Sequence, residues 1–139
     1  MPASLRPLYR IALIALVLSI NCRGNAASLF KLQFFNWLLK SSSLQELIEE
    51  KVTRQSVFTL DLIHLDPMVN LALNYAFADN LISITCNSRI NPKYKLTDKG
   101  HEFVKLILQD KESALAIERK FLERIGKKIS EVELKRELL

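Results

Sequence analysis

The side chains that could do chemistry in this 139-residue sequence are few and scattered. His64 and His101 are its two histidines, and neither has a cysteine, histidine or carboxylate at the spacing of a metal site. We expect His64 at a strand end and His101 in the first turn of a helix. No nucleophile turn marks a serine for triad chemistry. These residue types therefore predict structural roles, and we expect no enzyme activity and no metal centre.

The glycines and cysteines argue against a cofactor as well. The three glycines, at positions 24, 100 and 126, are far apart, whereas a loop that cradles phosphate needs clustered glycines. Two cysteines, Cys22 and Cys86, are too few for a disulfide framework, and we expect both to be reduced thiols. The net charge of +5 permits contact with nucleic acid without requiring it.

The N-terminal segment has two interpretations. A basic start, an apolar run over Ile11–Ile20 and small residues up to Ala26 imitate a signal peptide. The run is too short to span a bilayer, which takes about 20 residues. Cleavage near Ala26 would also leave Cys86 as a lone thiol outside the cell. Because Pro7 can start a helix that is apolar all round, we favour a buried central helix over Pro7–Ile20 and a cytoplasmic protein.

Further helices are predicted from caps and apolar spacing. Ser28 caps a second helix to about Lys40, whose polar stripe we expect in solvent and whose Phe35 we place towards an interface edge. The stripe is Gln33, Asn36 and Lys40, and the inward side is Phe30, Phe34, Trp37 and Leu38. A short third helix has the apolar edge Leu44, Leu47, Ile48 and Val52.

Alternation over 58–62 predicts a strand, and Asp66-Pro67 starts a helix to about Asn80. We expect its inner face to be Val69, Leu73, Phe77 and Leu81. Residues 81–97 read as a β-hairpin, and Thr97 caps a helix whose inner face is Phe103, Val104, Ile107 and Leu108. A sixth helix over 112–125 stops at Gly126, and a last short helix follows over 130–138.

This order of elements is that of a winged helix-turn-helix. Leu96-Thr97-x-x-Gly100 after a wing strand is its most specific part: leucine points to the core, threonine caps the next helix, and glycine allows close backbone approach. The predicted fold class is mainly α (α+β), a winged helix-turn-helix-like domain with a β-hairpin wing and C-terminal helices. We expect the winged-helix-like domain over 1–110 and a helical extension over 111–139, which packs on the domain or on a partner.

The helix before the wing is normally the one that reads DNA. Here it contains no lysine or arginine, and its outward polar residues are Asn70 and Asn74. Asparagine can pair with adenine, but a helix flanked by acids is repelled by phosphate. Residues 80–100 contain four basic residues and one acidic residue, which gives a local charge of +3. These candidate contacts to a DNA backbone are Arg89, Lys93, Lys95 and Lys99; a solvated hairpin explains them equally well.

The chain also has many large apolar residues for its size, which favours a protein interface. The candidate partner-interface residues are Asn70, Asn74, Tyr75, Phe121 and Leu138.

Together, these segments resemble the middle component of bacterial ABC-three-component systems, which include Lamassu-type anti-phage defence systems. The resemblance covers about residues 6–108. It rests on the opening Arg6-Pro7-Leu8-Tyr9-Arg10-Ile11, on Phe35-Asn36-Trp37-Leu38-Leu39, on the Asp66-Pro67 helix, and on the wing with Leu96-Thr97-Asp98-Lys99-Gly100.

This resemblance implies a non-catalytic accessory or bridging subunit in bacterial anti-phage or anti-plasmid defence. The implied partners are an SMC-like (Rad50-like) ATPase and an effector, often a nuclease, with no cofactor and no membrane. The resemblance supplies no catalytic residues. Two alternatives remain at this point: a winged-helix DNA-binding transcription regulator, and an exported small protein.

Overall fold

The computed structural model describes residues 7–40, 45–46, 48–50, 66–109 and 115–130. This part is mainly helical with a small three-stranded antiparallel sheet, which confirms the expected mixture of helices and a β-hairpin. The helices are α1 (Pro7–Ile20), α2 (Leu29–Leu38), α4 (Pro67–Ala78), α5 (Asp98–Gln109) and α6 (Ala116–Ile125). The strands are β1 (Ala26–Ser28), β2 (Ile82–Cys86) and β3 (Lys93–Leu96), and a short 3₁₀ turn, η2 (Arg23–Asn25), precedes β1.

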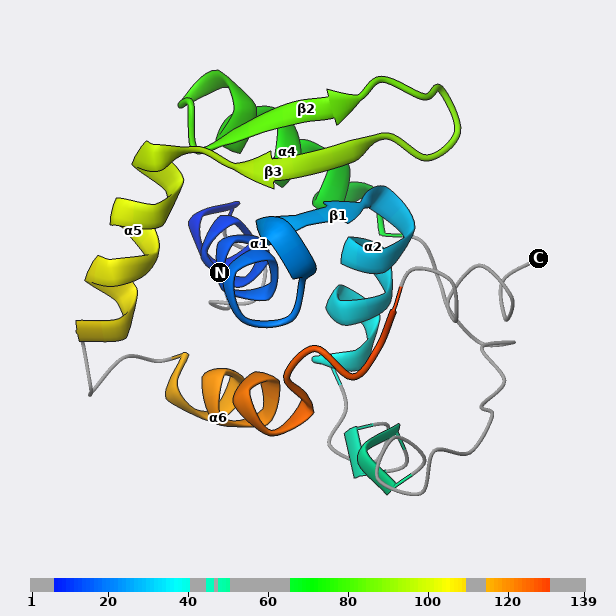
Figure 1. The fold of residues 1–139 in the computed structure, drawn as a ribbon, viewed down its shortest axis with the longest axis vertical. Helices are drawn as coiled ribbons and strands as arrows, with labels where there is room; N and C mark the ends of the chain where they lie inside the picture. The colour runs from blue at the N-terminus through cyan, green and yellow to red at the C-terminus, as the bar shows by residue number, and fades with distance from the viewer. Residues whose placement is uncertain (1–6, 41–44, 47, 51–65, 110–114, 131–139) are drawn as a thin grey trace.

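Helix α1 is the centre of the fold, as its apolar sequence predicts (Figure 1). It contacts α2, α4, α5, α6 and strand β3. Every residue over 12–18 is buried. A helix that is apolar all round can be covered on every side, so its central position follows from its composition. None of the helices in the described residues is long and apolar enough to cross a bilayer.

The sheet contains a strand that sequence reasoning missed. Its order is β1-β3-β2, with Ala26 opposite Lys95 and Ile82 opposite Leu96. Strand β1 has only three residues, Ala-Ala-Ser, and no apolar–polar alternation, so nothing local marks it as a strand. The strand predicted over 58–62 lies outside the described residues, as does most of the last predicted helix.

The predicted helix starts are confirmed by hydrogen bonds. The Ser28 hydroxyl accepts from the backbone N–H of Lys31 at the start of α2. The Asp66 carboxylate accepts from the N–H of Met68, with Pro67 in the first turn of α4. The Thr97 hydroxyl accepts from the N–H of Gly100 in α5. Each cap satisfies an amide that the helix itself leaves without a partner.

Gly100 allows α5 to pack against the connection between α4 and β2. A Cβ at this position would lie 2.2 Å from the carbonyl oxygen of Leu81, so no other residue fits without movement. The connection is itself tightly hydrogen-bonded, because the N–H groups of Asn80 and Leu81 donate to the carbonyls of Phe77 and Ala76. The close approach that the sequence predicts for this glycine is confirmed.

The polar stripe that starts on α2 is only partly solvated, because Lys40 is exposed whereas Gln33 is buried, which corrects the prediction in part. Gln33 is 2 % exposed, and its side-chain amide makes two hydrogen bonds with the backbone of Asp66, at 2.9 and 3.1 Å. Asn36 and Lys40 donate to the Asp66 carboxylate at 3.3 and 3.0 Å. The stripe is polar because it binds the start of α4, whose backbone groups need partners.

The apolar faces of α2 and α4 also differ from the prediction in part. Phe35, expected towards an interface edge, is buried and packs edge-on against Phe34 with ring centroids 5.4 Å apart. Phe77, expected inside, is 49 % exposed. The buried residues of α4 are instead Val69, Ala72, Leu73 and Ala76. The two alanines let α4 pack closely on α1, and this turns Phe77 outward.

Helix α6 packs on α1, so the described part of the C-terminal extension covers the domain. The Tyr9 hydroxyl donates to a Glu118 carboxylate oxygen at 3.0 Å. Burial, followed by this hydrogen bond and the Glu118 charge, raises the pKa of Tyr9 to about 12. At the other end of α6 the Asn21 side-chain amide donates to the carbonyls of Leu122 and Gly126, at 2.9 and 2.7 Å. Gly126 ends α6 as predicted.

Candidate interaction site on helix α4 and the β-hairpin

Helix α4 presents an uncharged face to solvent. Residues 67–78 contain no lysine, arginine, aspartate or glutamate. Asn70, Asn74 and Tyr75, three of the predicted interface residues, are all exposed, and Tyr75 is 52 % exposed. We call the exposed side of the helix the α4 face; it consists of Asn70, Leu71, Asn74, Tyr75, Phe77 and Ala78.

Sequence reasoning missed two large apolar members of the α4 face. Leu71 is 39 % exposed and Phe77 is 49 % exposed. The sequence did contain a signal for this exposure. Val69, Ala72, Leu73 and Ala76 recur at helical spacing and form an apolar stripe that faces inward. With that stripe inside, Leu71 and Phe77 must lie outside. Three large apolar side chains on one uncharged helix face form the kind of surface that protein interfaces use.

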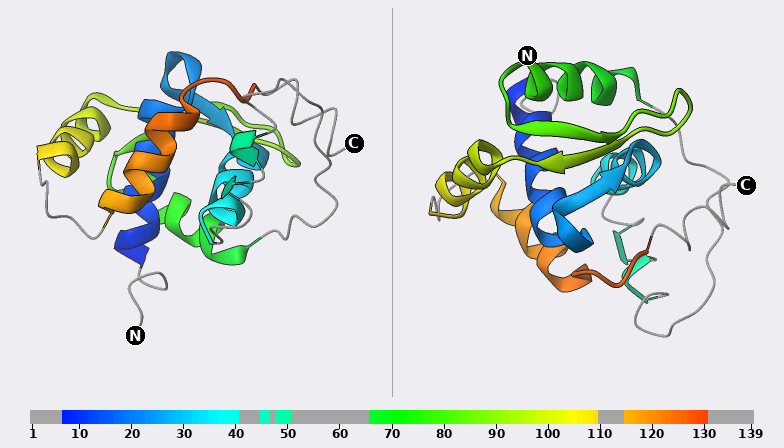
Figure 2. Two further views of the ribbon diagram at one scale, coloured as in Figure 1. Left: turned by 90° about the horizontal axis from the view of Figure 1, so that it is seen from below. Right: turned by 45° about the horizontal axis from the view of Figure 1, so that its top comes forward.

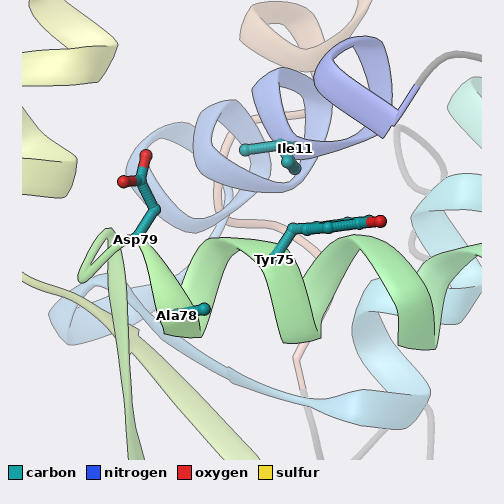
Figure 3. A pocket seen from close by; sticks show the side chains of 4 residues that line it. All are labelled: Ile11, Tyr75, Ala78 and Asp79. Atoms are coloured by element: carbon teal, nitrogen blue, oxygen red, sulfur yellow. The ribbon is translucent and has the colours of Figure 1, made fainter.

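A shallow depression lies beside this face, between α4 and α1. It is lined by Ile11 of α1 and by Tyr75, Ala78 and Asp79 (Figure 3). In the close-up, Ile11 lies across from Tyr75, and the Asp79 carboxylate stands at the end of the depression. The lining is therefore apolar along its length and acidic at one end. The acidic end is already paired, because the ammonium of Lys99 lies 3.4 Å from the Asp79 carboxylate.

The position of α4 is fixed by a buried polar network at its first residue. The Asp66 carboxylate lies 3.2 Å from the guanidinium of Arg10 and 3.0 Å from the ammonium of Lys40. The side chains of Arg10 and Asp66 are only 6 % and 13 % exposed. Arg10 also donates to Asn36 of α2. The network therefore joins α1, α2 and the start of α4.

The charge state of Asp66 reflects this network. Burial by itself raises the pKa of the Asp66 carboxyl. The hydrogen bonds from Met68 and Lys40 and the charges of Arg10 and Lys40 outweigh burial, so the pKa lies below its ordinary value of 3.8. Asp66 is thus ionised at neutral pH and holds the helix start in place.

The basic residues predicted on the wing separate into two groups. Arg89 and Lys95 are exposed on the hairpin, and Lys93 is half-buried on the same strand as Lys95. Lys99 lies instead in the first turn of α5, and its ammonium donates to the backbone carbonyl of Asp79 at 2.9 Å. It therefore stabilises the C-terminal end of α4, where a cation interacts favourably with the helix dipole. It does not extend the basic surface of the hairpin.

One further cation escaped the sequence prediction. Arg23 is exposed in η2, directly before β1. It is far from the hairpin in sequence, and only the pairing of β1 with β3 brings it to the same sheet. No local pattern could have revealed this placement.

The two remaining predicted interface residues do not join the α4 face. Phe121 is 1 % exposed and belongs to the core, where the Arg124 guanidinium lies 5.8 Å from the centre of its ring. This corrects its assignment to a partner surface: it lies on the side of α6 that packs on the domain. Leu138 lies outside the described residues.

The histidine and cysteines of the described residues lie in separate parts of the fold. No three histidine, cysteine or carboxylate side chains among them lie close enough to hold a metal ion. His101 is half-buried in α5, and His64 lies outside this part of the chain. Both cysteines are reduced, Cys22 in the core and Cys86 exposed on β2. What the site offers is two surfaces for binding: the α4 face and the basic side of the sheet.

Comparisons of the chain with protein family models, with characterised proteins and with solved structures find no match.

Proposed function

We propose that this chain is a non-catalytic accessory subunit that binds an SMC-like (Rad50-like) ATPase through the α4 face, within a bacterial anti-phage or anti-plasmid defence complex. The single observation that carries the proposal is the α4 face itself. It holds Leu71, Tyr75 and Phe77 in solvent and has no cation. Removing such side chains from water upon binding is favourable, and aromatic residues at interface centres contribute most to affinity.

The same observation weighs against sequence-specific DNA reading. A helix that enters the major groove needs cations against the phosphates. Helix α4 has none, and its two flanking charges are Asp66 and Asp79. The face that a DNA-reading helix uses is therefore available to protein, and we place the transcription regulator second.

A winged-helix fold belongs to the proposal too. It is supported by a helix directly before a two-stranded antiparallel hairpin, and by Thr97 and Gly100 in their expected roles after it. The pairing of an earlier short strand, β1, with the second hairpin strand is also in keeping with it. Winged helices serve as protein-binding accessory modules as well as DNA readers, so the fold is compatible with a subunit role.

The partner's identity comes from the resemblance to the middle component of three-component systems. In that setting the chain bridges or regulates the ATPase and an effector, often a nuclease. The exposed apolar side chains of the α4 face are compatible with a helix from such a partner, whose apolar side chains would lie along Leu71 and Tyr75.

The test is expression of the tagged full chain together with its neighbouring genes in the native host. We expect a large coiled-coil ATPase to co-purify with it, and deletion of its gene to abolish phage resistance. If the chain emerges as a lone monomer and its deletion leaves phage sensitivity unchanged, the proposal is wrong.

A further inference from the structure

Around the paired residues Ile82 and Leu96 the sheet has one covered side and one open side. Ile82 and Leu96, which face each other across β2 and β3, are both buried. Lys95, one residue away on β3, is exposed, and its cross-strand partners are Ser83 on β2 and Ala26 on β1. Because side chains alternate along a strand, Lys93 and Lys95 point to the open side, roughly 7 Å apart.

The sheet and the turns that flank its strands are basic and contain no acid. Residues 23–28 and 82–96, which form η2, the three strands and the wing turn, include four cations and no aspartate or glutamate. We call these cations the sheet cations: Arg23, Arg89, Lys93 and Lys95. Within the described part of the chain none of them makes an ion pair. By contrast, Arg10, Lys99 and Arg124 each pair with a carboxylate elsewhere in the fold.

The sheet cations are held on a rigid support. The wing turn is anchored to the start of α2: the backbone N–H of Phe30 donates to the Asn91 side chain at 2.9 Å, and that of Leu29 donates to the Pro92 carbonyl at 2.8 Å. These bonds use amides that α2 leaves unpaired. A surface that is already ordered loses less conformational entropy when it binds a ligand.

We propose that the open side of the sheet binds the sugar-phosphate backbone of double-stranded DNA without reading its sequence. A row of unpaired cations with no interspersed acid matches a polyanion. The same strand and turn also carry small polar side chains, Ser83, Thr85 and Ser88, which can donate hydrogen bonds to phosphate oxygens. An anionic membrane is the less favoured ligand, because this region exposes only two large apolar residues, Ile90 at the wing tip and Ile84 on the other side of the sheet, whereas membrane-binding surfaces use several together.

This inference is independent of the proposed ATPase contact, since the two surfaces share no residue. It assigns the chain a second role as the DNA-contacting element of whatever assembly it joins. The helix that usually reads bases takes no part in it.

The test is fluorescence anisotropy of a labelled DNA duplex titrated with the purified full chain at 50 to 200 mM salt. Four phosphate contacts predict a slope of log affinity against log salt of about −3.6, which is a loss of about 150-fold over this range. The variant R23Q/R89Q/K95Q keeps one contact, and its affinity should fall only about 3- to 4-fold over the same range. The matched control is K120Q/K127Q/K128Q, which also removes three exposed cations but from α6 and the segment after it.

The expected result is weakened binding with a shallow salt dependence in the sheet variant, and wild-type behaviour in the control. Four outcomes overturn the proposal: no DNA binding by the wild-type chain at 50 mM salt, equal losses in the two variants, binding to one defined operator that survives high salt, or binding to anionic vesicles but not to DNA. The wild-type salt slope is informative without any variant, because a slope weaker than about −1 leaves room for one phosphate contact only.

Discussion

Replacing Asp66 by alanine is the sharpest test of how the α4 face is positioned. The substitution removes the cap of α4, which costs about 1 kcal/mol. It also takes away the charged partner of Arg10, whose side chain is 6 % exposed. Breaking a buried ion pair by deleting one partner costs about 3 to 5 kcal/mol. Because Arg10 keeps its hydrogen bond to Asn36, we take the lower end and expect a total loss of about 4 kcal/mol.

The assay is urea unfolding followed by circular dichroism and by the fluorescence of Trp37, the one tryptophan in the chain. The matched control is Asp79→Ala, because the Asp79 carboxylate also pairs with a lysine but is 70 % exposed. A surface ion pair of this kind contributes about 0 to 1 kcal/mol. If Asp66→Ala and Asp79→Ala lower the free energy of unfolding by similar amounts, the network does not hold α4 as described.

The pH dependence of the same protein gives a second readout for Asp66. Its pKa is lower in the folded state than the ordinary value of 3.8, so its stabilising contribution is fully present above that value. The contribution is lost as the pH falls below 3.8 and through the lower folded pKa. Asp66→Asn keeps a capping oxygen but cannot titrate, so its stability should fall less steeply than that of the wild type in this acid range.

Gly100→Ala should lower stability by about 1 to 3 kcal/mol in urea unfolding, because the new Cβ would lie 2.2 Å from the Leu81 carbonyl oxygen. Gly24→Ala is the control: no atom lies within 4 Å of the new Cβ, and only the positive φ of 65° is unfavourable, so stability should fall by about 1 kcal/mol. A larger loss of stability at Gly24 than at Gly100 would refute the close approach. Tyr9 should ionise near pH 12 in an ultraviolet titration, and Tyr9→Phe should remove that step. Since the pKa of Tyr9 is raised in the folded state, its contribution to stability is present below pH 10 and is lost as the pH rises towards 12. Ionisation of Tyr9 near pH 10 would contradict its hydrogen bond to Glu118.

Local features of the fold could be predicted from the sequence because their cause is local. Ser28, Asp66-Pro67 and Thr97 cap helices through hydrogen bonds to amides two or three residues away. The hairpin over β2 and β3 follows from alternation around an asparagine-rich turn. Such signals need no knowledge of the rest of the chain.

Features that depend on distant partners were predicted wrongly or not at all. The stripe around Gln33 looks like a solvated face until the start of α4 is packed against it. Strand β1 exists because β3 lies beside it, and their paired residues are 65 to 69 positions apart in the chain. The difference is 65 for Ser28 and Lys93 and 69 for Ala26 and Lys95. Phe121 looks like a partner contact until α6 is seen to pack on α1.

The candidate site likewise has features that could be predicted from the sequence and features that could not. The absence of charge on α4 and the exposure of Asn70, Asn74 and Tyr75 could be predicted, because they follow from composition and helical spacing. The layout of the molecule in Figure 2, with α4 alongside β2, could not, and neither could the hydrogen bonds that join the hairpin turn to the start of α2. For the same reason the pairing of Lys99 with Asp79, 20 residues earlier in the chain, was beyond sequence reasoning.

The most direct test of the central claim is the affinity of the chain for its co-purified ATPase, measured for two matched double variants. Asn74→Arg with Tyr75→Glu places two charges on the α4 face, and both positions are exposed, so the domain should fold. Leu106→Glu with Gln109→Arg makes the same change of charge at two exposed positions of α5. We expect the α4 variant to bind at least about 30-fold more weakly, which is about 2 kcal/mol, because charges are buried there without partners. The α5 variant should bind like the wild type. Equal affinities for the two variants, or an α4 variant within twofold of the wild type, would contradict the claim that this face is the interface.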